Sequence, residues 1–348
     1  MDGKMKIAAM DGARNITFFE REIGTPGEDE VLVKMEYVGV CGSDLHFYQD
    51  GRLGNWVPKG KLVLGHESGG KVVEVGKNVK HLVPGDKVAL EPGVPCGKCE
   101  FCRQGKYNLC VDMSFMAIPD EREGAFKEFC IHPANMCFKL PVNMSTCEGA
   151  LIEPLAVGFH AANISGAKVG QNAVILGAGC IGLTMLMALK AYGVNEVYVF
   201  DIIDKRLEKA QKLGATGVFN AKEVDIVDKL MNLTNNNGVD MVYEAAGSEA
   251  TILTAAKLVK KGGVVTLIGM APKPELTFDI GTLTEREAEI KTVFRYRNLY
   301  PTAIKAVGDG LVNLKDIVSD EFKFDDLYNA LEHCISNKDD IIKAVITF

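Results

Sequence analysis

Short apolar runs separated by glycine turns dominate the first ninety or so residues of the chain. Runs rich in β-branched residues occupy positions 31–38, 70–76 and 86–91. Closely spaced strands joined by such turns are typical of a small barrel or sandwich. We expect no helix in this part of the chain.

The pattern changes at about residue 149, where strand-like apolar runs begin to alternate with amphipathic stretches of helical period. The expected strands are 173–176, 197–200, 217–219, 241–243 and 264–268, and the expected helices are 205–213, 224–233 and 250–259. This alternation predicts a parallel sheet covered by helices on both faces.

The alternation ends after about residue 293, and the tail has a different pattern. It contains a helix-like stretch at 324–335 and a strand-like stretch at 341–348. We expect the tail to rejoin the first domain. A chain of 348 residues exceeds what one hydrophobic core usually organises, so two domains are expected.

The net charge and the N-terminal sequence indicate which partners and which cellular compartment to expect. The net charge is −7 and the basic residues are dispersed, which argues against nucleic acid or an anionic membrane as partner. The polar start has no apolar signal region. The uncharged apolar run at 173–189 is short for a membrane span and carries three glycines, so we interpret it as a buried strand, turn and helix. We expect a cytoplasmic protein.

Four of the ten cysteines form a compact cluster. They are Cys96, Cys99, Cys102 and Cys110. Cytoplasmic thiols stay reduced, so the cluster favours a metal over a disulfide framework. Four thiolates surround one tetrahedral zinc with no open position, which implies a structural zinc. An iron–sulfur cluster, which also uses four thiolates, and free buried cysteines are the alternatives.

A second set of potential metal ligands is spread along the chain. Cys41, His66, Glu67 and Glu153 offer the thiolate, imidazole and carboxylate groups that a catalytic zinc binds while it keeps one position open. A lone histidine would be interpreted as a core residue, but His66 is followed directly by Glu67 in a glycine-rich segment. The sequence does not decide whether Glu67 or Glu153 is the third protein ligand.

A glycine-rich turn follows the expected strand 173–176. Its residues are Gly177, Gly179, Cys180, Ile181 and Gly182, in the pattern GxGxxG. Such a turn lets the backbone approach a pyrophosphate at the start of a helix. The alternative is a glycine-rich turn with no ligand.

An acidic residue lies where a dinucleotide-binding domain needs one. Asp201 ends the next expected strand, nineteen residues after Gly182. A carboxylate there accepts hydrogen bonds from the ribose hydroxyls of NAD and repels the additional phosphate of NADP. Arg206 is a candidate for the ribose or phosphate region, or else a solvated helix residue.

Taken together, these motifs resemble the zinc-dependent medium-chain dehydrogenases, and most closely the polyol branch of sorbitol and xylitol dehydrogenases. The resemblance covers nearly the whole chain and rests on residues 38–46, 64–67, 150–157, 177–182 and 294–296 together with the four clustered cysteines. It implies an α/β protein with a doubly wound Rossmann domain (154–292, NAD-binding) and a GroES-like β-barrel catalytic domain (1–153 and 293–348).

The resemblance also implies roles for single residues. Cys41, His66 and Glu67 would bind the catalytic zinc, and Glu153 would lie next to the metal, as a ligand or through its water. Asp44 would accept a hydrogen bond from the His66 ring.

Two further residues would handle the proton of the substrate. Ser43 would hydrogen-bond the reacting hydroxyl, and His46 would pass the proton outward. The alternatives without a catalytic role are a helix cap for Ser43 and a surface position for His46.

Four residues would contact the substrate: Phe47, Phe115, Arg295 and Tyr296. Arg295 could instead be an interface residue. Phe47 and Ile118 replace a tyrosine and a threonine that are usual in the animal sorbitol enzymes, which puts the preferred polyol in doubt. The four clustered cysteines, which those enzymes have lost, indicate a bacterial-type member.

The expected function is therefore that of an NAD-dependent zinc polyol dehydrogenase that yields a ketose, with one catalytic and one structural zinc. The alternatives are a threonine 3-dehydrogenase, a butanediol dehydrogenase, a polyol-phosphate dehydrogenase and an inactive sensor that binds zinc and NAD. The family resemblance implies a homotetramer or homodimer. The preferred polyol and the direction of the reaction do not follow from the sequence.

Overall fold

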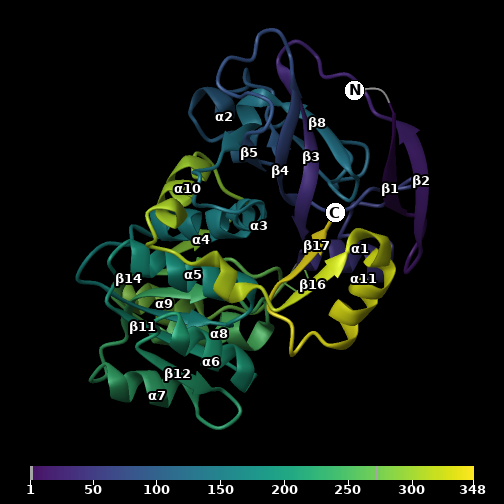
Figure 1. Ribbon diagram of the computed structural model, residues 1–348. Coiled ribbons are helices and arrows are strands. Elements are labelled where there is room, and N and C mark those ends of the chain that lie inside the picture. Colours follow the sequence, from purple (N-terminus) through teal and green to yellow (C-terminus); the bar gives the residue numbers. More distant parts are fainter. Residues whose placement is uncertain (1–2, 272, 274) are drawn as a thin grey trace. The chain divides into compact units, whose positions relative to one another are not determined.

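The computed structural model describes residues 3–271, 273 and 275–348 (Figure 1). Its contacts divide the chain into two compact units, one comprising Met1–Glu153 with Tyr300–Phe348 and the other Pro154–Leu299. The first division lies at the expected position. The second lies between Leu299 and Tyr300 instead of between residues 292 and 293, so Arg295 and Tyr296 belong to the second unit.

The first unit is built round a seven-stranded sheet in the order β16-β17-β3-β4-β5-β9, with β8 also paired to β3. These strands are β3 (Glu30–Gly39), β4 (Glu67–Val75), β5 (Lys87–Leu90), β8 (Phe129–Pro133), β9 (Cys137–Lys139), β16 (Asp320–Lys323) and β17 (Ala344–Thr347). The three predicted strands of this region are present as β3, β4 and β5. Their buried side chains belong to one core with those of helix α11 (Leu327–Ser336).

Smaller elements complete the first unit. Two further antiparallel strand pairs are formed by β1 (Lys4–Met10) with β2 (Ile16–Glu22) and by β6 (Gly93–Val94) with β7 (Ser114–Phe115). The helices are α2 (Glu100–Arg103), η1 (Tyr107–Leu109), η2 (Ala134–Met136), α3 (Thr146–Ala150), α10 (Tyr300–Gly308), η3 (Leu314–Ile317) and η4 (Phe324–Asp326).

The expectation that this region contains no helix is wrong. Helix α1 (Gly42–Asp50) follows β3 directly, with Cys41 as its N-cap and Gly51 in the left-handed region (φ 70°) after its end. The Asp44 carboxylate accepts a hydrogen bond from the Cys41 amide (3.0 Å), which stabilises the first turn. Only Asp44, Phe47 and Tyr48 of this helix are buried. A buried face with just two apolar residues leaves no clear hydrophobic period in the sequence.

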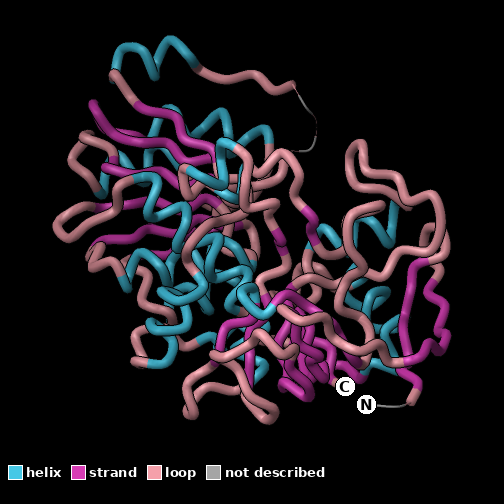
Figure 2. Tube along the Cα trace, turned by 90° about the horizontal axis from the view of Figure 1, so that it is seen from above, coloured by secondary structure: helices cyan, strands magenta, loops and turns pink. Residues whose placement is uncertain are grey.

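The tail rejoins the first unit, as predicted. Strand β17 pairs antiparallel with β3, where Val345 lies opposite Gly39, and parallel with β16. The C-terminal end of the chain therefore lies within a cluster of strands, near the label C in Figure 2. This pairing brings residues about 300 positions apart in the sequence next to each other.

The second unit is a six-stranded parallel sheet in the order β12-β11-β10-β13-β14-β15. Its strands are β10 (Asn172–Leu176), β11 (Glu196–Asp201), β12 (Gly217–Asn220), β13 (Val239–Glu244), β14 (Val259–Leu267) and β15 (Glu289–Thr292). Its helices are α5 (Cys180–Ala191), α6 (Asp204–Lys212), α7 (Ile226–Leu233), α8 (Glu249–Leu258) and α9 (Ile280–Arg286), and α4 (Ile152–Ser165) starts at the boundary. Because the strand order reverses at β10 and the crossovers between parallel strands are right-handed, this is a doubly wound Rossmann sheet.

The predicted strands and helices of this unit are present, together with β15, α4 and α9, which were not predicted. Strand β15 was not expected, because it is an edge strand whose side chains are mostly exposed and of whose four residues three are polar. The apolar run at 173–189 forms β10, a turn and α5, as predicted. Nowhere in the described chain is a helix long and apolar enough to cross a membrane.

Candidate metal and cofactor sites

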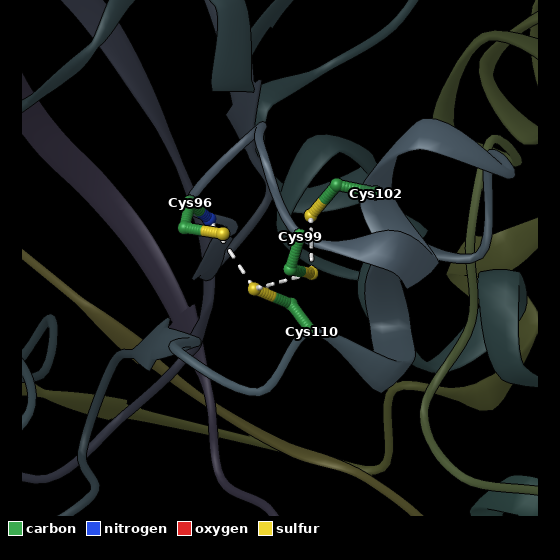
Figure 3. A group of neighbouring side chains, drawn as sticks. All are labelled: Cys96, Cys99, Cys102 and Cys110. Atoms are coloured by element: carbon green, nitrogen blue, oxygen red, sulfur yellow. Dashed lines mark hydrogen bonds between the residues drawn. The ribbon is translucent and has the colours of Figure 1, made fainter.

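The four clustered cysteines point their sulfur atoms toward one another (Figure 3). The Cys99 sulfur lies 3.4 Å from that of Cys102 and 3.9 Å from that of Cys110. Four thiolates at about 2.3 Å from one tetrahedral zinc would be separated by about 3.8 Å. All four cysteines are free thiols. The spacing and the donor set fit a closed zinc site.

Backbone amides already stabilise negative charge in this cluster. Hydrogen bonds from the amides of Cys102 and Val111 lower the pKa of Cys99 to about 6. Burial and the neighbouring thiols raise the pKa of Cys102 to about 12. In the four-cysteine lobe (residues 96–110), the backbone amides thus favour the thiolate form of Cys99, the form that binds a metal.

The second predicted set of ligands is also gathered by the fold. The ligand atoms of Cys41, His66 and Glu67 all lie within 4.8 Å of one another. Cys41 precedes α1, and Glu67 begins β4, where it pairs with Gly39 of β3. A Cβ atom on Gly39 would lie 2.0 Å from the Glu67 carboxylate, so a glycine is needed to make room for this ligand.

Asp44 lies beside His66, as the resemblance implied. Its Oδ1 is 3.5 Å from the ring Nδ1 and accepts a hydrogen bond from the Gly65 amide (2.9 Å). Burial alone would raise the pKa of Asp44, but the His66 ring and the amides of Gly65 and Cys41 outweigh it and lower this pKa. Burial would lower the pKa of His66, but Asp44 and Cys41 raise it well above its usual value. The carboxylate thus orients the ring and leaves Nε2 to bind a metal.

Lys343 is a buried partner of Glu67 that the sequence analysis missed. Its Nζ lies 2.8 Å from both carboxylate oxygens of Glu67 and donates a hydrogen bond to the Val40 carbonyl (3.0 Å). Lys343 and Glu67 are 4% and 1% exposed. The available signal was a single lysine within the apolar run at 341–346. Lys343 compensates the charge of this ligand and holds its position.

Glu153 is not a member of this group. It is buried in the first turn of α4. Among the described residues, the set of ligand atoms within 4.8 Å contains Glu67 and does not contain Glu153. The geometry therefore favours Glu67 as the third protein ligand.

The residues expected to handle the proton lie on α1. Ser43 is in the first turn, and because the N-cap is Cys41, the interpretation of Ser43 as a helix cap is wrong. His46 is exposed, with its Nδ1 3.7 Å from Asp50. Their roles in proton transfer stay predictions.

The expected substrate residues of the first unit differ in their surroundings. The Phe115 ring packs against the His66 ring, with centroids 5.8 Å apart. Phe47 is 1% exposed and belongs to the hydrophobic core. The structure thus brings Phe115 to the candidate zinc ligands, whereas Phe47 supports α1 from inside.

The expected substrate residues of the second unit lie in an unusual backbone segment. Arg295 has a left-handed backbone (φ 56°), and its guanidinium lies over the Phe294 ring, 4.8 Å from the centroid. The Tyr296 side chain is buried. Non-glycine residues adopt positive φ at a cost, and such residues cluster at functional sites.

The glycine turn after β10 has the geometry of a nucleotide loop. Gly177 is left-handed (φ 100°), and a Cβ on Gly182 would lie 1.9 Å from the Gly177 carbonyl oxygen. A Cβ on Gly179, by contrast, would meet nothing within 4 Å, although Gly179 is the N-cap of α5. The open space at this helix start, beside Cys180 and Ile181, fits a pyrophosphate.

Asp201 is tied to this loop. One carboxylate oxygen accepts a hydrogen bond from the Ala178 amide (2.6 Å), and the other accepts from the amides of Ile202 (2.7 Å) and Ile203 (2.9 Å). Arg206 follows in the first turn of α6. The carboxylate therefore lies at the edge of the candidate cofactor site, where a ribose would be held.

Comparisons with known proteins agree with this geometry. Residues 27–142 match the model of the alcohol dehydrogenase GroES-like domain, and residues 180–309 match that of the zinc-binding dehydrogenases. The chain is 45% identical to an uncharacterised zinc-type alcohol dehydrogenase-like protein of Escherichia coli, over 93% of both chains. It is 37% identical to the sorbitol dehydrogenase of Bacillus subtilis, over 98% of this chain and 97% of the other.

A solved structure has the same fold. The crystal structure of an Escherichia coli oxidoreductase of unknown specificity superimposes with a TM-score of 0.96 at 42% identity and covers 99% of both chains. The expected combination of a GroES-like and a Rossmann domain is therefore confirmed. The chain belongs to the zinc-dependent medium-chain dehydrogenases, an oxidoreductase family with a nicotinamide cofactor, and is close to the sorbitol dehydrogenases.

Proposed function

We propose that the protein is an NAD-dependent zinc polyol dehydrogenase that oxidises a secondary alcohol of a free sugar alcohol to the ketose. The observation that carries the proposal is the group of Cys41, His66 and Glu67, which offers one thiolate, one imidazole and one carboxylate within 4.8 Å. Three protein ligands leave the fourth position of a tetrahedral zinc for a substrate hydroxyl. The sorbitol dehydrogenase relative and the glutamate at position 153, where alcohol dehydrogenases usually have cysteine, support a polyol as substrate.

Each group of the site has a distinct task in this proposal. The zinc would supply Lewis acidity toward the substrate hydroxyl and NAD would accept the hydride. Asp44 keeps the His66 ring in the binding orientation, and Lys343 balances the charge of Glu67. Ser43, in the first turn of α1, would hydrogen-bond the hydroxyl and relay its proton, which His46 would pass outward to solvent. Phe115, packed on His66, would exclude water from one side of the site.

The choice of NAD over NADP rests on Asp201. Its carboxylate is buried at the edge of the loop, with three backbone amides already directed at it. A second negative charge from a ribose phosphate would have to approach this carboxylate, at a cost of several kcal/mol if both were desolvated. The ribose hydroxyls of NAD can instead donate hydrogen bonds to it.

The test is the formation of NADH from NAD with a panel of sorbitol, xylitol, ribitol, L-threonine, 2,3-butanediol and polyol phosphates. Each assay is repeated after chelation and after zinc is restored. We expect turnover of a free polyol that is lost on chelation and returns with zinc. Turnover confined to threonine, butanediol or a phosphate would refute the polyol proposal and leave the zinc site standing. Two bound zinc ions without any turnover would identify a sensor instead.

A further inference from the structure

Glu91 is a buried carboxyl group that the proposed chemistry does not use. It follows the last residue of β5 and is 2% exposed. Its amide donates a hydrogen bond to the Met136 carbonyl (2.9 Å), and its carbonyl accepts one from His132 Nε2 (2.8 Å). Its carboxylate accepts a hydrogen bond from the Tyr107 hydroxyl (2.7 Å). Backbone and side chain of Glu91 are thus both fixed at the end of the strand.

The Tyr107 hydroxyl connects Glu91 to the four-cysteine lobe. Tyr107 begins the short helix η1, three residues before Cys110. The lobe contains little regular structure besides α2 and η1, so its fold depends on the metal that its thiolates bind. The position of the Tyr107 hydroxyl therefore depends on the state of the lobe.

On its other side, Glu91 directly follows a strand that pairs with the strand of Glu67. Leu90 of β5 pairs with Ser68 of β4. Because the two strands are antiparallel, Glu91 and Glu67 are the next residues on the same side of this pair. The end of α3 packs on β4, because a Cβ on Gly69 of that strand would lie 2.9 Å from the Ala150 amide nitrogen. Glu153 follows three residues after Ala150.

The pKa of Glu91 depends on Tyr107 and on Glu153. Burial and the charge of Glu153 raise the pKa of Glu91 to about 7, and the hydrogen bond from Tyr107 opposes this rise. The His132 ring cannot supply a compensating charge, because burial lowers its pKa to about 3. The Tyr107 hydroxyl is thus the group that supports the ionised form of Glu91.

We propose that Tyr107 and Glu91 are positioning residues that link the four-cysteine lobe to the catalytic zinc site. When the lobe is closed round its metal, the Tyr107 hydroxyl holds Glu91, and Glu91 holds the end of β5 in place beside β4, the strand that carries Glu67. When the lobe opens, this support is lost and the catalytic metal is held less tightly. The inference rests on the proposed function in so far as Cys41, His66 and Glu67 bind zinc.

The test uses the zinc-loaded full-length protein and the substitutions Tyr107→Phe and Glu91→Gln, singly and together. Tyr107→Phe keeps all four thiolates and removes one hydroxyl. The matched control is Tyr243→Phe, which removes the buried hydrogen bond between the Tyr243 hydroxyl and Ser165 (2.6 Å) in the second unit. The readout is zinc release to a chromogenic chelator, with the phase of the catalytic zinc assigned from His66→Ala.

We expect Tyr107→Phe and Glu91→Gln each to accelerate release of the catalytic zinc about tenfold, the lower end of the usual effect of a residue behind a metal ligand. Release of the lobe zinc should stay unchanged in Glu91→Gln. The double substitution should add little to either single one, because both interrupt the same connection. Tyr243→Phe should release both metals at the rates of the unsubstituted protein.

Where a polyol is turned over, the pH dependence of kcat gives a second readout that a merely structural role would not change. In Tyr107→Phe the acid limb of the kcat profile should move to higher pH, because the ionised form of Glu91 loses its hydrogen bond. In Glu91→Gln this limb should be absent, because the side chain no longer titrates. Unchanged release of the catalytic zinc in Tyr107→Phe would overturn the inference. Accelerated release in a protein that turns over no polyol would support the link and refute the proposed function alone.

Discussion

At the scale of single residues, the candidate zinc site depends on short distances between its side chains and the surrounding backbone. The Glu67 carboxylate occupies the space that a side chain on Gly39 would fill, and the amides of Gly65 and Cys41 converge on Asp44. Buried polar groups must find partners, and here each candidate ligand has one. Small changes at these positions should therefore affect metal binding more than folding.

The substitution Gly39→Ala tests the first of these approaches. The added Cβ would lie 2.0 Å from the Glu67 Oε2 atom, so the carboxylate has to move away from Cys41 and His66. We expect bound zinc, measured by metal analysis, to fall from two ions per chain to one, with loss of turnover. The control Gly60→Ala places a Cβ with no heavy atom within 4 Å and should bind two. Two ions in Gly39→Ala would show that Glu67 is dispensable as a ligand.

The substitution Asp201→Asn tests the cofactor site. It removes the negative charge that would repel NADP, and one acceptor for the amides of Ala178, Ile202 and Ile203. Hydrogen bonds to a charged group contribute about 1.5–3 kcal/mol, so KM for NAD should rise about tenfold or more while the preference over NADP shrinks. Asp204→Asn, three residues further on in α6, is the control. Equal use of NADP by the unsubstituted protein would contradict this role of Asp201.

At the scale of elements, strand pairing assembles the site from distant segments. Strand β17 pairs with β3, and β3 pairs with β4, so Lys343, the residue before β17, meets Glu67 at the start of β4. The pair is almost completely buried. Removal of one member of a buried ion pair is costly because the other charge remains without compensation.

Lys343→Met should therefore destabilise the zinc-free protein by about 3–5 kcal/mol, as measured by urea unfolding in the presence of a chelator. With zinc bound, Glu67 has a second cation beside it, and the loss should be smaller. The control Lys305→Met breaks an exposed ion pair with Asp309 (2.7 Å) and should cost less than about 1 kcal/mol. If Lys343→Met has the same small effect in both metal states, Lys343 does not support Glu67.

At the scale of the whole molecule, one buried carboxyl group should make stability depend on pH. Burial raises the pKa of Glu91 to about 7, so the folded state binds a proton more tightly than the unfolded chain does. The resulting stabilisation is fully present below the unfolded value of about 4.5 and is lost as the pH rises through about 7. Its size is at most about 3 kcal/mol.

Urea unfolding between about pH 4 and pH 8 checks this prediction against Glu91→Gln, which cannot titrate. The unsubstituted protein should lose stability across this range relative to the variant. Parallel curves for the two proteins would mean that Glu91 does not change its protonation state on unfolding.

Much of the fold and of the candidate site follows from local patterns in the sequence. The alternation of strands and helices after residue 149 predicted the Rossmann sheet, because a buried parallel strand is apolar throughout. The spacing of the four cysteines predicted the lobe, because a short loop can bring all its thiols to one point. The glycine turn is likewise a motif of neighbouring residues, and Asp201 lies at the end of the next strand, so both can be recognised without long-range contacts.

Only the tertiary structure decided the rest. The proximity of Glu67 to Cys41 and His66, the buried partner Lys343 and the position of Glu91 depend on the register of strands far apart in the chain. Helix α1 depends on a cysteine cap and a buried aspartate, which carry no hydrophobic period. Local spacing determines which groups a segment offers, whereas long-range pairing determines which of them meet, since register and packing are properties of the whole sheet.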